Sequence, residues 1–100
     1  MPITFTTTKK QIADHNYILV KFEIKDVLDP SELKRLNPPE VPAKHGVILS
    51  GRGPVWLYGF LVHFYHPSCF VGVYDPRLGA VVVESHVRNI EAGDVIPVED

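Results

Sequence analysis

The stretch FVGVYDPRLGAVVV, residues 70–83, places a polar turn between two very apolar runs. Both runs are rich in β-branched or aromatic residues, which is typical of buried strands. Within the turn, Asp75 can bond to its own backbone, Pro76 presets φ, and Gly79 supplies a positive φ. The stretch therefore predicts a β-hairpin with a short loop and a bulge, carried on a rigid scaffold.

Arg77 stands at the tip of this hairpin, two residues after Asp75. A guanidinium fixed at that point can grip a phosphate, or it can pair with the neighbouring carboxylate. A well-made turn with a solvated arginine is the simpler explanation. The local pattern alone therefore leaves the role of Arg77 open.

The composition is that of an ordinary globular domain. The chain has 100 residues, 45% of them hydrophobic and 22% charged, which suits one core and predicts one domain over residues 1–100. A net charge of −2 predicts no general attraction for nucleic acid, so a DNA partner is not expected and any polyanion site is local. A single cysteine, no signal peptide pattern and no span long enough for a bilayer predict a cytoplasmic protein without a membrane partner.

Two strands are expected near the N-terminus, over residues 3–8 and 17–24, and they can form a hairpin. A helix start is then indicated at Asp29, which suits the N-cap, with Pro30 at the first helical position. We expect this helix to end by Asn37, before two prolines.

A short apolar strand is predicted over residues 46–50, a helix over 54–66, and a closing edge strand over 95–98. Strands that alternate with two helices predict a small α/β domain with a mixed sheet. Between the strand and the second helix lies Ser50-Gly51-Arg52-Gly53. Such a turn offers unpaired backbone N–H groups and a positive helix end to an anion, and Arg52 adds charge. Its spacing matches neither known phosphate-loop signature, so a tight structural turn stays the alternative.

His63 and His66 fall one turn apart on the second predicted helix, about 5–6 Å between their Cβ atoms. They can share a ligand, although two histidines at this spacing are frequent by chance and no zinc-protease signature is present. Asp75 is a candidate partner for them. If the helix packs on the sheet, an imidazole and this carboxylate meet near a phosphate held by Arg52 or Arg77.

Three short runs, GRGPVWL at 51–57, HFYH at 63–66 and YDPRLGAVVV at 74–83, closely resemble the third class of CRISPR ring nucleases. The resemblance covers roughly residues 46–86. It implies a small Rossmann-like domain that dimerises and binds cyclic tetra-adenylate, the second messenger of type III CRISPR systems. It also implies manganese-dependent cleavage of the ring to linear di-adenylate products, which switches off antiviral effectors, with the ring held between two dimers.

Carried over residue by residue, the resemblance places catalytic roles on His66, Asp75 and Arg77. It places the ligand in the loop formed by Ser50, Gly51, Arg52 and Gly53, with Arg77 also in contact. The manganese ion is expected near Asp75, with His63 as a second candidate ligand. Glu84 stands where other members carry a glutamine.

Three other functions compete with this interpretation. They are a cyclic-nucleotide sensor or sponge without turnover, a 3′ exonuclease on short adenine-rich RNA, and a structural dimer. The nucleophile, a ribose 2′-OH or a water molecule, also stays open.

A helix of thirteen residues separates Arg52 from His66 by about 18–20 Å. In the stack of two homodimers that the resemblance implies, we therefore expect one layer to bring its His66 to the phosphate held by the other.

Overall fold

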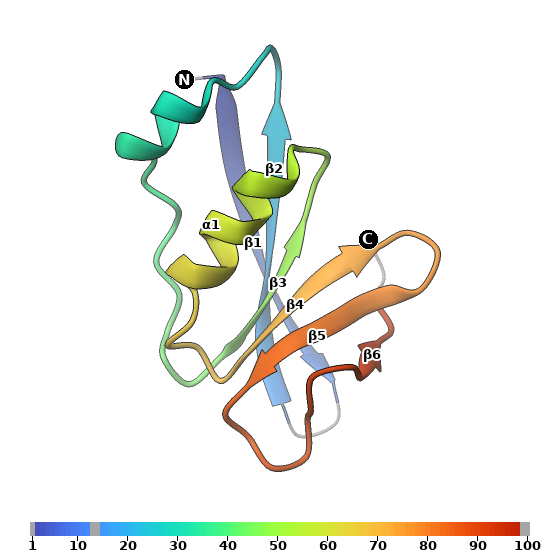
Figure 1. The fold of residues 1–100 in the computed structure, drawn as a ribbon. Coiled ribbons are helices and arrows are strands. Elements are labelled where there is room, and N and C mark those ends of the chain that lie inside the picture. Colours follow the sequence, from blue (N-terminus) through green and yellow to red (C-terminus); the bar gives the residue numbers. More distant parts are fainter. Residues whose placement is uncertain (1, 13–14, 99–100) are drawn as a thin grey trace.

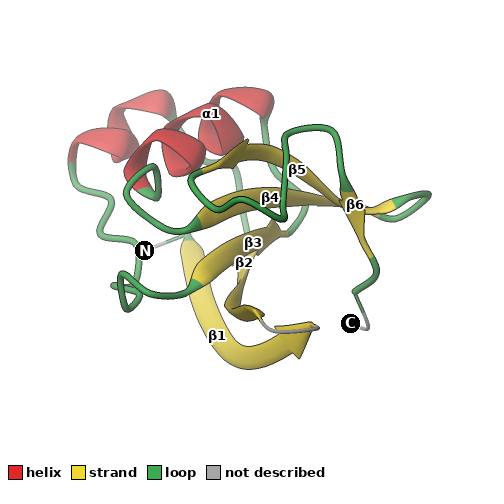
Figure 2. Ribbon diagram, turned by 90° about the horizontal axis from the view of Figure 1, so that it is seen from below, coloured by secondary structure: helices red, strands yellow, loops and turns green. Residues whose placement is uncertain are grey.

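The computed structural model describes residues 2–12 and 15–98. These residues form a six-stranded mixed sheet in the order β1-β2-β3-β4-β5-β6, with helices against one face (Figures 1 and 2). The predicted α/β class is therefore confirmed. The elements are β1 Ile3–Ile12, β2 His15–Ile24, the 3₁₀ helix η1 Pro30–Lys34, β3 Gly46–Ser50, α1 Val55–Phe64, β4 Phe70–Asp75, β5 Gly79–Ser85 and β6 Val95–Ile96.

The three central strands β2, β3 and β4 run parallel, while β1, β5 and β6 pair antiparallel with their neighbours. Each parallel step needs a crossover, and η1 and α1 lie in the two crossovers. Both lie on the same face of the sheet (Figure 2). Leucines around η1 pack into one core with Leu57 and Leu61 of α1. The domain therefore has two layers, and the expected Rossmann-like relationship and dimer stay predictions.

Only one of the two predicted helices is an α-helix in the described part of the chain. The segment after Asp29 forms the five-residue 3₁₀ helix η1, with Asp29 as its N-cap and backbone bonds from Glu32 to Asp29 and from Arg35 to Glu32. Prolines at 38 and 39 leave no room for a longer helix. The capping prediction was right and the helix type was wrong. No helix in the described part is long and apolar enough to cross a membrane.

The sheet buries side chains on both faces. On the helix face, Leu49 and Val71 pack against α1. On the other face, Ile48, Phe70 and Val82 are covered by the C-terminal segment, which folds back and contributes Ile90 and Ile96, among others. That segment covers only part of this face. The remaining part, beside the ends of β2 and β3, carries polar side chains.

The predicted hairpin is confirmed between β4 and β5. Asp75 pairs with Gly79 across the turn, and the backbone N–H of Leu78 donates to the Asp75 carbonyl at 3.0 Å. Gly79 has φ +120°, and a Cβ there would lie 2.9 Å from the Ile96 carbonyl oxygen. Glycine is required for both reasons. The bulge lies away from the turn, where the register shifts opposite Val71 and Gly72.

Candidate functional site

The segments that carry the predicted site residues lie at two opposite edges of the sheet, set by the two ends of β3 and β4 (Figure 1). Because β3 and β4 are parallel, their last residues and the turns that follow, 50–53 and 75–77, lie at one edge, which we call the arginine edge. His66 precedes β4 and therefore lies at the other edge. The six residues of β4 span about 17 Å at ~3.3 Å per residue. The expected meeting of His66 with Asp75 at one phosphate therefore does not occur within a single chain.

The loop of the arginine edge is held tightly against β2. A Cβ on Gly51 would lie 2.6 Å from the Phe22 carbonyl oxygen, and one on Gly53 would lie 2.8 Å from the Phe22 ring. Only glycine tolerates such contacts. The hydroxyl of Tyr58 on α1 donates to the Gly51 carbonyl, and burial raises the pKa of Tyr58, which keeps that donor protonated. The loop is thus a fixed platform.

Arg52 is exposed on this platform, and no described residue forms an ion pair or a hydrogen bond with its guanidinium. Pro54 is the N-cap of α1, and no described side chain caps the helix there. The first N–H groups of a helix have no partner within the helix, and the dipole makes this end positive. Arg52 and the start of α1 together form an arrangement suited to an anion.

At the hairpin tip, Arg77 is paired with Asp75. The backbone N–H of Arg77 donates to Asp75 Oδ1 at 2.8 Å, and the guanidinium lies 3.4 Å from the same carboxylate. The backbone bond is the main cause that lowers the pKa of Asp75, and the side-chain bond adds to it. The Arg77 side chain is 87% exposed, so the pair is weak and a phosphate can compete for the guanidinium. Asp75 orients the arginine without blocking it.

The opposite edge carries a cluster of His66, Glu84 and His86, which we call the histidine cluster. His66 Nδ1 lies 2.6 Å from Glu84 Oε2, and His86 Nε2 lies 3.1 Å from the His66 carbonyl oxygen. The two imidazole rings meet edge to face at 5.2 Å between centroids. His66 lies just beyond α1, which ends at Phe64 instead of the predicted residue 66. The backbone also fixes the position of His86, since its backbone N–H donates to the Cys69 carbonyl oxygen at 2.8 Å.

The β-bulge in β5 aims Glu84 at His66. In a regular strand Val82 and Glu84 would point to the same face, because side chains alternate. Here Val82 is buried on the face away from α1, whereas Glu84 pairs with Val71, whose side chain packs on the α1 face. The register shift between the two pairs makes the difference. The sequence left the role of Glu84 open, because the family resemblance places a glutamine at this position.

The donors of the histidine cluster fit a divalent transition ion. One ligand atom from each of its three side chains lies within 4.8 Å of the others, and two imidazoles with a carboxylate suit zinc or manganese. Glu84 Oε1 is buried and has no hydrogen-bond partner among the described residues, so it is a free acceptor. Neither His63 nor Asp75, the predicted metal ligands, belongs to this cluster. His63 is exposed on α1, and Asp75 lies at the arginine edge.

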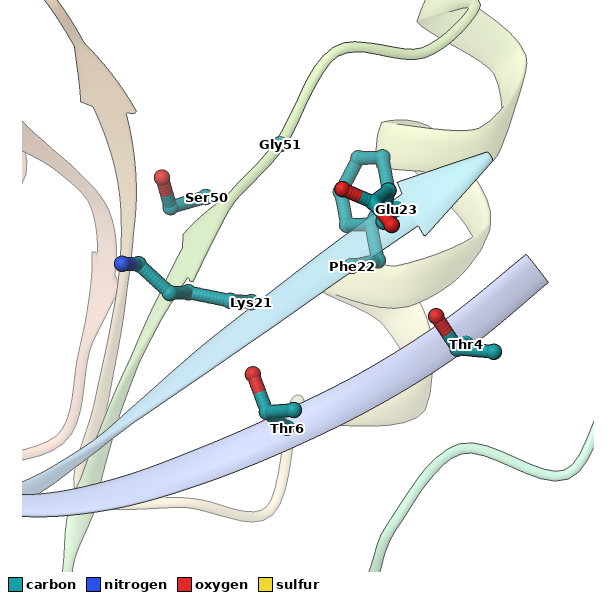
Figure 3. Close-up of a pocket in the computed structure, with 7 residues that line it drawn as sticks. All are labelled: Thr4, Thr6, Lys21, Phe22, Glu23, Ser50 and Gly51. Carbon is teal, nitrogen blue, oxygen red and sulfur yellow. The ribbon is translucent and has the colours of Figure 1, made fainter. Parts of the chain in front are cut away.

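A cavity of about 350 Å³ lies beside the arginine edge, on the sheet face opposite α1 (Figure 3). Ser50 and Gly51, both predicted to contact the ligand, are among its lining residues. The other lining side chains come from β1 and β2 and were missed from the sequence, because only the strand pairing brings them together. The cavity is lined by Thr4, Thr6, Lys21, Phe22, Glu23, Ser50 and Gly51.

Comparison with known proteins places these features in a family. The family model described as "CRISPR-associated protein (Cas_csx3)" matches residues 21–97, a range that contains both edges. An uncharacterized protein of Aquifex aeolicus (strain VF5) is 57% identical over 83 residues, which cover 78% of this chain and 75% of that protein. The chain therefore belongs to the Cas_csx3 family of CRISPR-associated proteins.

Proposed function

We propose that this protein is a ring nuclease that binds cyclic tetra-adenylate and cleaves it to linear di-adenylate, thereby switching off type III CRISPR antiviral signalling. The observation that carries the proposal is the division of the molecule into an anion-binding arginine edge and a histidine cluster at the opposite edge. Membership in a CRISPR-associated family supports the choice of substrate. The proposal includes a cytoplasmic location. It also includes a Rossmann-like relationship, because the β3-α1-β4 crossover resembles the βαβ unit from which Rossmann folds are built.

The arginine edge supplies the groups that hold the ring. Arg52, the start of α1 and Arg77 offer donors and positive charge to phosphates, while the chain as a whole carries a net charge of −2. A ring of four phosphates has internal symmetry, so a homodimer presents the same groups to it twice. Local arginines are sufficient for such a ligand, and a general basic field is unnecessary.

The histidine cluster supplies proton transfer. When His66 donates Nδ1–H to Glu84, its Nε2 carries the lone pair that can take a proton from the attacking oxygen. That oxygen is either the ribose 2′-OH or a water molecule. As it bonds to phosphorus, the bond from phosphorus to the leaving ribose oxygen breaks, and that oxygen takes its proton from the protonated His66 or from solvent. Two such cuts convert the ring into two linear di-adenylates. Arg77 stabilises the charge that develops on the phosphate, and Asp75 holds Arg77 in position. Because the two edges lie apart, the cluster of one copy must act on the phosphate held by another.

Manganese, which the family resemblance implies, would be held by His66, Glu84 and His86. A divalent ion bound there would supply positive charge near the reacting phosphate. His66 would in that case hold the ion instead of acting as the base. Both roles use His66 and Glu84, whereas only the metal role uses His86, so a metal titration of a His86 variant separates them.

We expect His86→Ala to weaken Mn²⁺ binding by at least about 10-fold, because it removes one of three donors. Titration calorimetry with MnCl₂ and the electron paramagnetic resonance signal of free Mn²⁺ measure this in the absence of any nucleotide. His63→Ala removes an exposed histidine outside the cluster and should leave the affinity unchanged. If His63→Ala weakens binding and His86→Ala does not, the ion lies elsewhere, as the sequence first suggested.

We expect Arg52→Ala to weaken binding of cyclic tetra-adenylate by about 1.5–3 kcal/mol, the usual contribution of a hydrogen bond to a charged group. The affinity is best measured in a His66→Ala background, in which the ligand is consumed slowly. Arg35→Ala is the matched control, since Arg35 is exposed beside η1 and pairs with Glu32. Equal affinities for the two arginine variants would remove Arg52 from the binding site.

The experiment that tests the function is incubation of the protein with cyclic tetra-adenylate, with and without Mn²⁺, followed by chromatographic separation of the products. Linear di-adenylate that appears only with the active protein supports the ring nuclease. Tight binding without products favours the sponge. Faster degradation of linear adenine-rich RNA than of the ring favours the exonuclease.

A further inference from the structure

Another cavity lies at the end of α1 that leads to His66. It has a volume of about 250 Å³ and is lined by Glu40, Val41, Ala43, Phe64, Tyr65, Pro67 and Ser68. The last four of these residues lie within two positions of His66 in the chain. The cavity is therefore next to the backbone that carries His66, and it shares no residue with the arginine edge.

Tyr65 fixes the walls of this cavity. Its hydroxyl donates to the Pro39 carbonyl oxygen at 2.6 Å, which holds the crossover segment between η1 and β3 against the end of α1 (Figure 1). Its ring meets the Phe64 ring edge to face, with 4.9 Å between the centroids. Phe64 is nevertheless 39% exposed. An aromatic ring that is held in one orientation and partly open to solvent is a surface on which a planar group can stack.

Two polar groups of the lining lack partners. Ser68 is only 7% exposed, and its hydroxyl forms no hydrogen bond with any residue that the structure describes. Buried polar groups in proteins are nearly always hydrogen-bonded, so this hydroxyl is available to a ligand. Glu40 is exposed and has no ion-pair partner within residues 2–12 and 15–98. The cavity thus combines apolar walls with one hydroxyl and one carboxylate.

This composition suits a nucleobase. Small-molecule sites are mostly apolar, with a few polar groups that fix orientation, and proteins bind unpaired bases by stacking them on aromatic rings and bonding to their edges. The Ser68 hydroxyl can donate or accept, and an ionised Glu40 can accept from an exocyclic amine. The volume is below the roughly 300 Å³ at which sites for whole drug-sized ligands begin, so one base fits and a complete dinucleotide does not. The same groups would accept any base that carries an amine.

We infer that this cavity seats the base that adjoins the phosphate on which His66 acts. A base and its phosphate are joined through one ribose, so a base stacked on Phe64 brings its phosphate close to His66. The inference rests on the proposed function for the identity of that base, which in the ring is adenine. Phe64 and Ser68 then hold the ligand from the layer that supplies the histidine cluster, while the arginine edge of another copy holds its phosphate.

The direct test uses adenosine as the probe, because a nucleoside has no phosphate to bind at the arginine edge. In a titration followed by ¹H–¹⁵N correlation spectra, we expect the largest amide shifts at Phe64, Tyr65 and Ser68. Phe64→Ala should abolish the shift at Ser68. Absence of these shifts, shifts confined to residues 50–53, or an unchanged response of the Phe64→Ala variant would overturn the assignment.

The second test measures kcat/KM for cyclic tetra-adenylate with Mn²⁺. Phe64→Ala is expected to lower it about 5- to 150-fold, the usual contribution of one stacked base. Phe64→Tyr keeps the ring face and should stay near the wild-type value. Val95→Ala is the control, since it shortens an apolar side chain of β6 that is 47% exposed and lies outside this cavity. Equal values for the alanine and tyrosine variants of Phe64 would contradict the base site.

Phe64→Leu separates a base from another occupant. Leucine is apolar but has no ring face, so it should stay close to the alanine variant if a base stacks there. Full recovery by Phe64→Leu would mean that the cavity receives an apolar side chain of another copy, and the base assignment would be wrong.

The two proposals can fail separately. If the wild type cleaves the ring, adenosine shifts none of the cavity amides and Phe64→Ala cleaves at the wild-type kcat/KM, the base site is wrong and the ring nuclease stands. If adenosine shifts the cavity amides and no ring is cleaved with Mn²⁺, a base site exists and the proposed function is wrong.

Discussion

His66→Ala is expected to slow the cleavage of cyclic tetra-adenylate by roughly 10²–10⁴, the usual contribution of general acid–base catalysis. The affinity for the ring should stay nearly unchanged, because His66 lies at the edge of the sheet opposite Arg52 and Arg77. The side chain is 55% exposed and is oriented by Glu84 at 2.6 Å, so its removal leaves no cavity in the core. The loss should therefore appear in the rate and not in folding.

The rate is best measured under single-turnover conditions with Mn²⁺, with protein in excess over radiolabelled ring. His63→Ala is the matched control, because His63 is also an exposed histidine in the last turn of α1 and lies outside the histidine cluster. We expect it to cleave at the wild-type rate. Cleavage by His66→Ala at that same rate would remove His66 from the reaction.

The elements fixed by local chemistry were predicted well from the sequence. The residues of the β4–β5 turn, Asp75, Pro76 and Gly79, specify a hairpin by their own backbone preferences, and the structure has it. The loop around Arg52 was predicted from a strand, two glycines and a helix start, all close in the chain. The close contacts of Gly51 and Gly53 with Phe22 involve a strand about thirty residues away in the chain, so they could not be predicted from the sequence.

The features that depend on strand pairing were not predicted. Glu84 reaches His66 because one extra residue in β5 shifts the register, and a bulge leaves no mark in the alternation of side chains. Lys21 and Thr6 belong to one cavity because β1, β2 and β3 pair in one register. His63 and Asp75, the metal ligands expected from the sequence, lie on α1 and at the arginine edge, outside the histidine cluster, and their role as ligands stays a prediction.

The separation of the two edges has a consequence for mixtures of variants. Arg77→Ala alone is expected to slow cleavage about 10²–10³-fold, because it removes charge stabilisation at the phosphate. His66→Ala alone is expected to slow cleavage by a similar factor or more. In each pure variant every site lacks one group. If a site takes its arginine edge from one layer and its histidine cluster from another, an equal mixture contains sites in which both groups are intact.

With random assembly, a site needs an intact Arg77 from a His66→Ala copy and an intact His66 from an Arg77→Ala copy. Each condition is met half of the time, so the mixture should recover about a quarter of the wild-type rate once the copies have exchanged. A mixture of His66→Ala with Glu84→Ala is the control, because both changes damage the same cluster and no combination of copies repairs it. A mixture of His66→Ala and Arg77→Ala that stays as slow as its components would mean that one chain supplies both groups. That result would contradict the assignment of the two groups to different copies, since a β4 strand of about 17 Å lies between them in one chain.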